Sequence, residues 1–122
     1  MPVSYSIDRA QRRITVRIVG ELDEAEIRTI ERDVLSDAAY DRAYGTLVDA
    51  REACNLIGSV SILREMRAKP VVDAGVRRAF VTSNLLIYRL ARLFQATHDA
   101  SGLTDDVRVF RTFEEAELWF AT

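Results

Sequence analysis

This sequence contains few of the residues that carry disulfides, metal sites and histidine chemistry. Among its 122 residues there is one cysteine, Cys54, and one histidine, His98. A single cysteine can form neither a disulfide within the chain nor a thiolate metal cage. We expect Cys54 to be a small buried residue rather than a reactive thiol, and His98 to lie on the surface near the end of a helix. The sequence therefore predicts no catalytic residue, no metal and no cofactor.

Motifs of the common enzyme families and of membrane proteins are also missing. The chain has no phosphate-binding glycine loop, dinucleotide fingerprint, paired-histidine motif or Gly-x-Ser-x-Gly elbow. No apolar run approaches the roughly 20 residues that a membrane-spanning helix needs, and the first residues lack a signal-peptide core. The net charge of −2 gives no electrostatic reason to expect nucleic acid or an anionic membrane as a partner. We expect a cytoplasmic protein without membrane insertion.

What is present is the pattern of one α/β domain that spans residues 1–122. Alternating runs at 3–7 and 14–19 predict an antiparallel hairpin, with Gly20 at its end. Short apolar runs predict buried parallel strands at 46–48, 79–81 and 107–110. Between and after them, helical patterns occupy 21–37, 59 or 61 to 70, 84–100 and 112–120. The predicted fold is a mixed, mostly parallel sheet of about five strands in the order β-β-α-β-α-β-α-β-α.

Polar side chains mark the predicted helix starts. Asp23 is placed to cap the first helix, with Glu26 three residues later, and Thr112 is placed to cap the last. Either Ser83 or Asn84 is placed to cap the long helix that runs to about residue 100.

Polar residues also follow two of the predicted strands. Asp49 closes the strand at 46–48, and a polar loop through Arg51 leads to the next helix. Neighbouring parallel strands open on one edge of a sheet, so this loop and residues 82–84 are expected to form a shallow pocket that tolerates an anion. The alternatives are an Asp49–Arg51 ion pair that holds the loop, and simple helix capping at 82–84. The predicted ligand or partner site contains Asp49, Arg51, Ser59, Thr82, Ser83 and Asn84.

The long helix at 84–100 is more apolar than contact with one sheet requires. Nine of the twelve residues from 85 to 96 are apolar. Either neighbouring elements enclose this helix, or it presents an apolar edge to another chain or to an apolar ligand. We expect self-association, as a homodimer. The predicted interface residues are Leu85, Tyr88, Arg89, Arg92 and Phe94.

With this predicted order of strands and helices, the chain resembles the SpoIIAA-like, STAS-related (STAS/SEC14) domain families. The resemblance spans nearly the whole chain and depends on four segments: the hairpin that ends in Val19-Gly20, LVDAR at 47–51, YRLARLFQA at 88–96, and VRVFRTFEEAELWF at 107–120. It implies a small α/β domain used for regulation or ligand binding rather than for catalysis.

The resemblance also implies a candidate phosphoacceptor. In the antagonist proteins of this group, a partner kinase phosphorylates a serine at the start of the helix after the third strand, which corresponds here to Ser59 or Ser61. The family motif is Asp-Ser-Ser-Gly, whereas this chain has Ile-Gly-Ser-Val at 57–60. The acid is missing, and a helix N-cap is the simpler interpretation of Ser59.

Three functions remain open from the sequence. The preferred one is a non-enzymatic STAS-like regulatory or scaffold domain that acts through protein contacts. The alternative is a carrier of a small apolar ligand or lipid, which the Sec14-like side of the resemblance implies. The third is an enzyme that uses the loop with Asp49 and Arg51.

Overall fold

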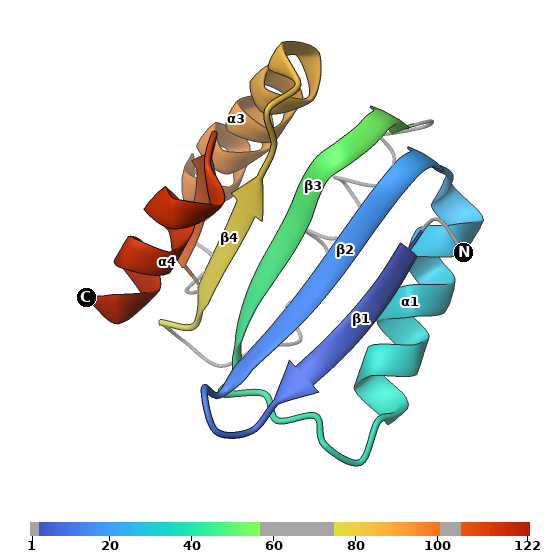
Figure 1. Ribbon diagram of the computed structural model, residues 1–122, viewed down its shortest axis with the longest axis vertical. Helices are drawn as coiled ribbons and strands as arrows, with labels where there is room; N and C mark the ends of the chain where they lie inside the picture. Colours follow the sequence, from blue (N-terminus) through green and yellow to red (C-terminus); the bar gives the residue numbers. More distant parts are fainter. Residues whose placement is uncertain (1–2, 57–74, 101–105) are drawn as a thin grey trace.

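The sheet begins with the predicted antiparallel hairpin. In the computed structural model, which describes residues 3–56, 75–100 and 106–122, strand β1 (Val3–Asp8) pairs with strand β2 (Arg13–Leu22) from Val3↔Ile18 to Asp8↔Arg13 (Figure 1). Successive side chains of a strand point to opposite faces. The apolar residues of the two alternating runs therefore share one face of the hairpin.

Three parallel strands complete the sheet, in the order β1-β2-β3-β4-β5. They are β3 (Gly45–Leu56), β4 (Arg77–Val81) and β5 (Asp106–Phe110). β3 and β4 are parallel neighbours, with Leu47 opposite Ala79 and Asp49 opposite Val81. The predicted fold class, a mixed and mostly parallel α/β sheet, is confirmed.

The end that the sequence predicts for β3 is wrong. Asp49 does not close the strand, and Arg51 lies within it rather than in a loop, because β2 continues past Gly20 and pairs with β3 as far as Leu22↔Leu56. Two register shifts interrupt this pairing, and Gly20 adopts a φ of +73° at the second, a conformation open to glycine because it has no Cβ. β4 ends opposite Asp49, so the last part of β3 pairs with β2 alone.

Each helix in the described part of the chain begins at a predicted cap. Asp23, Asn84 and Thr112 each accept a hydrogen bond from the backbone N–H three residues on, at 2.9, 3.2 and 3.2 Å. None of these helices is both long and apolar enough to cross a membrane. The helix predicted from 59 or 61 to 70 lies outside the described residues. The described helices are α1 (Glu24–Ser36), α3 (Leu85–Ala100) and α4 (Phe113–Ala121).

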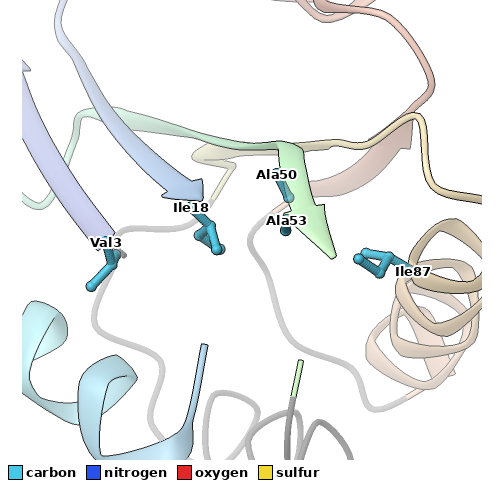
Figure 2. Close-up of a cluster of buried hydrophobic side chains, with 5 residues drawn as sticks. All are labelled: Val3, Ile18, Ala50, Ala53 and Ile87. Carbon is cyan, nitrogen blue, oxygen red and sulfur yellow. The ribbon is translucent and has the colours of Figure 1, made fainter. Parts of the chain in front are cut away.

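Helices cover both faces of the sheet and define two apolar clusters. Helices α1 and α3 lie on one face and α4 on the other (Figure 1). Figure 2 shows the first cluster, in which side chains from β1, β2, β3 and α3 gather on the α1/α3 face. On the opposite face, Trp119 and Ala116 of α4 pack against Leu47, Ala79 and Val81. Each polar side chain of β3 therefore points either to the α1/α3 face or to the α4 face.

Candidate functional site

Asp49 and Arg51 form a closely fitted ion pair along β3. The two residues are two positions apart in a strand, so both side chains lie on the α4 face. Arg51 donates from Nε to Oδ1 at 2.9 Å and from Nη2 to Oδ2 at 2.8 Å, and its backbone N–H donates to Oδ1 at 3.2 Å. Asp49 is 8% exposed. Its carboxylate therefore accepts three hydrogen bonds from one residue.

This geometry keeps Asp49 ionised. The hydrogen bonds from the Arg51 side chain lower the pKa of the Asp49 carboxyl below its ordinary value of 3.8, against the opposing effect of burial. The same contact raises the pKa of the Arg51 guanidinium. A general base works best with a pKa near the operating pH. Asp49 is therefore suited to fixing a positive charge and poorly suited to moving a proton near neutral pH.

Arg51 also connects β3 to the start of α4. Its guanidinium lies 4.9 Å from the ring centre of Phe113, the first residue of that helix. Glu114 adds a favourable charge interaction with Arg51. The sequence left open whether Asp49 and Arg51 help to bind an anion or form an ion pair that stabilises local structure. These contacts fit the ion pair.

Residues 82–84 lie beside this pair, at the end of β4. Thr82 follows Val81, the pairing partner of Asp49, and is fully buried. Its hydroxyl oxygen accepts from the Asn84 N–H at 3.2 Å, and Asn84 Oδ1 accepts from the N–H groups of Leu86 and Ile87. Ser83 is exposed. Two N–H donors that an anion would need at the start of α3 are thus already used by Asn84.

Several residues singled out by the sequence lie beyond what the structure describes. They are Ser59 and Ser61, and the side chains of Cys54, Phe94 and His98. Among the described residues, no group of three or more histidine, cysteine or acidic side chains is placed to hold a metal ion.

The long helix divides its apolar residues between two sides. Ile87 and Ala91 are buried against the sheet, whereas Leu85, Leu86 and Leu93 are 51%, 69% and 62% exposed. Of the other predicted interface residues, Arg89 and Arg92 are exposed. Tyr88 is half-buried, with the Arg111 guanidinium 5.7 Å from its ring centre.

We compared the chain with known proteins by sequence and by structure. No family model matches the chain, and no curated protein matches it in sequence. Its structure is similar to that of an uncharacterised protein of the DUF3478 family, with a SpoIIAA-like fold, from Shewanella loihica PV-4. The TM-score is 0.65 at 14% sequence identity, over 97% of this chain and 93% of the other. This chain has a SpoIIAA-like fold.

The SpoIIAA-like fold also brings together residues that the sequence does not connect. A hollow of about 530 Å³ is lined by residues of the β1–β2 turn, of the starts of β3 and β4, and of the end of α4. Figure 1 shows the β1–β2 turn and the starts of β3 and β4 at the same end of the sheet. The sequence feature that could have indicated this hollow is the presence of two arginine pairs, at 12–13 and 77–78. Their separation along the chain gives no reason to expect them to meet. The lining residues of this hollow include Gln11, Arg12, Arg13, Gly45, Arg77 and Phe120.

Proposed function

We propose that this chain is a non-enzymatic STAS-like domain that acts in regulation or as a scaffold by protein–protein contact through one face of α3. The α3 outer face is formed by Leu85, Leu86, Arg89, Arg92 and Leu93. The observation that carries the proposal is the exposure of its three leucines, each more than half accessible on one helix. Large apolar side chains gathered on a surface are typical of an interaction site.

The polar groups around Asp49 and at the end of β4 support a role without catalysis. The Asp49 carboxylate is engaged by Arg51, the Thr82 hydroxyl by the Asn84 N–H, and the Asn84 side chain by the first turn of α3. These groups act on one another and on the backbone, so they serve local structure. The hydrogen bonds from Arg51 also lower the pKa of the Asp49 carboxyl, which makes it a weak base.

A second copy of the chain is the first partner to test. Leu86 and Leu93 are seven residues apart, so they lie on one side of α3, two turns from each other. If two α3 helices pair in antiparallel fashion, Leu86 of each copy faces Leu93 of the other, which is the self-complementary arrangement of a two-fold dimer. Burial of each leucine would contribute about 1–2 kcal/mol. Arg89 and Arg92 would then form part of the polar rim.

Light scattering coupled to size exclusion tests this proposal. We expect the wild type to have twice the mass of one chain at high micromolar concentration, and Leu86→Glu to have the mass of one chain. The matched control is Leu118→Glu on α4, since Leu118 is also 69% exposed, and this variant should keep the dimeric mass. A monomeric wild type, or dissociation of both variants, would contradict self-association through α3.

The apolar-ligand alternative has less support from the described residues. The hollow near the start of β3 is lined by three arginines, which suit an anion better than an acyl chain. Native mass spectrometry of protein purified without denaturation distinguishes the two functions. A lipid adduct would favour a carrier, and a bare chain mass would favour the protein contact.

A further inference from the structure

The hollow at the start of the parallel strands is strongly basic. Arg12, Arg13 and Arg77 contribute to its lining. Glu117 of α4 forms an ion pair with Arg13, with Nη1 and Oε1 3.0 Å apart, and Asp106 of β5 is the pairing partner of Arg77. Arg77 donates from Nη1 to the carbonyl oxygen of Trp119 at 2.5 Å, near the end of α4. Two of the three guanidinium groups are therefore fixed in place by α4.

Arg12 differs from the other two arginines. It is exposed, and its side chain makes no hydrogen bond or ion pair with another residue in the described part of the chain. Its φ is +56°, a left-handed conformation that is unfavourable for a residue with a Cβ. The backbone is nevertheless fixed, because the Gly45 N–H donates to the Arg12 carbonyl oxygen at 3.2 Å. The turn thus holds the Arg12 backbone beside the hollow and leaves the donors of its guanidinium unused by the described residues.

One wall of the hollow is aromatic. Phe120 lines it, and Gly45 allows this ring to lie close to β3, since a Cβ at that position would approach Phe120 Cε1 to 3.0 Å. The guanidinium of Arg13 lies 4.9 Å from the centre of the same ring. Positive charge and an aromatic surface therefore occur side by side.

We propose that this hollow binds the phosphate group of a small phosphorylated molecule. Guanidinium groups match the geometry of phosphate oxygens and bind them in pairs, and a doubly charged phosphate needs more than one positive neighbour. The volume of 530 Å³ is within the range of small-molecule sites. Phe120 provides a surface for the organic part of the ligand. The proposal goes beyond the contact through α3 and does not depend on it.

Calorimetric titration with phenyl phosphate and with inorganic phosphate, at matched ionic strength in chloride, tests the site. We expect phenyl phosphate to bind more tightly than inorganic phosphate because its ring can contact Phe120. Arg12→Gln should weaken phenyl phosphate binding about tenfold, the effect of one lost charge-assisted hydrogen bond. In nitrogen-15 spectra, the amide signals that shift on titration should be those of residues 11–13, 45 and 75–77.

A matched control separates a local contact from a general effect of charge. Arg9 lies in the same turn, but its Nη2 donates to the Ala38 carbonyl oxygen at 3.2 Å rather than lining the hollow. Arg9→Gln should leave phenyl phosphate binding within about twofold of the wild type. Equal weakening by Arg9→Gln and Arg12→Gln, or equal affinity for the two phosphates, would contradict the proposal.

A second variant keeps the result independent of folding. Glycine adopts a φ of +56° without a Cβ clash, so Arg12→Gly should lose phenyl phosphate binding while its melting temperature stays the same or rises. An Arg12→Gly protein that binds as the wild type does would overturn the site. Absence of wild-type binding at about 10 mM phenyl phosphate would also overturn it.

Discussion

The pairing of Asp49 with Arg51 yields the sharpest test of how this sheet is held together. Replacing Arg51 with glutamine removes two charge-assisted hydrogen bonds from a carboxylate that is 8% exposed, and leaves only the bond from the backbone N–H. Hydrogen bonds to charged groups contribute about 1.5–3 kcal/mol. Because the Arg51 side chain is 46% exposed, solvent screens the pair. We expect Arg51→Gln to lower the free energy of unfolding by about 1–2 kcal/mol.

Urea denaturation at pH 7, combined with Asp49→Asn and the double variant, isolates the pair from other losses. The coupling free energy between the two substitutions should be about 1 kcal/mol, which exceeds the roughly 0.5 kcal/mol within which independent sites add. The slopes of the unfolding curves should be the same in all four proteins, so that the midpoints can be compared directly.

A surface ion pair on the neighbouring strand is the control. Arg17 of β2 pairs with Glu52 of β3, and both side chains are more than half exposed. Arg17→Gln should therefore cost less than about 0.5 kcal/mol. If Arg51→Gln unfolds at the same urea concentration as Arg17→Gln, the Asp49–Arg51 pair does not stabilise the fold. That result would favour a ligand-binding role for Asp49 and Arg51.

Two further predictions concern acid and close packing. Because the folded pKa of Asp49 lies below its ordinary 3.8, this carboxyl stabilises the fold above that pH and loses its contribution as the pH falls through the folded pKa. Asp49→Asn should therefore flatten the decline of unfolding free energy between pH 5 and 2, as followed by urea titrations at each pH, and an unchanged slope would be the contrary result. Gly45→Ala places a Cβ 3.0 Å from both the Arg77 carbonyl oxygen and Phe120 Cε1, and should destabilise the fold by about 1–3 kcal/mol in thermal or urea unfolding. A Gly45→Ala protein as stable as the wild type would show that β4 and α4 shift without cost.

The two ends of β3 show which parts of a strand can be predicted from the local sequence pattern and which cannot. The apolar run at 46–48 and its parallel neighbour at 79–81 are evident from the sequence, because a strand buried on both faces must be continuously apolar. The continuation from Asp49 to Leu56 is not, because Asp49, Arg51, Glu52 and Asn55 interrupt the apolar run and the extended form of this segment depends on pairing with β2. Pairing across two register shifts overrides the local preference for a loop.

The candidate site was also predicted only in part from the sequence. The sequence predicts that Asp49, Arg51 and Thr82 lie near one another, because its pattern puts each at or after the end of a parallel strand, although Asp49 and Arg51 in fact lie within β3. It does not reveal that Arg51 binds the Asp49 carboxylate through Nε and Nη2, nor that the Asn84 side chain accepts from the first N–H groups of α3. Hydrogen-bond geometry of this kind depends on backbone positions that no residue pattern specifies.

The order of the described strands and helices, the caps at Asp23 and Thr112, and the excess of apolar residues in the long helix were determined by the sequence alone. Each depends on residues within a few positions of one another, where propensity and periodicity act. Only the tertiary structure decided which leucines of α3 remain exposed and that Arg12, Arg77 and Phe120 surround one hollow. These features join segments that are tens of residues apart in the chain, and chain folding alone brings them into contact.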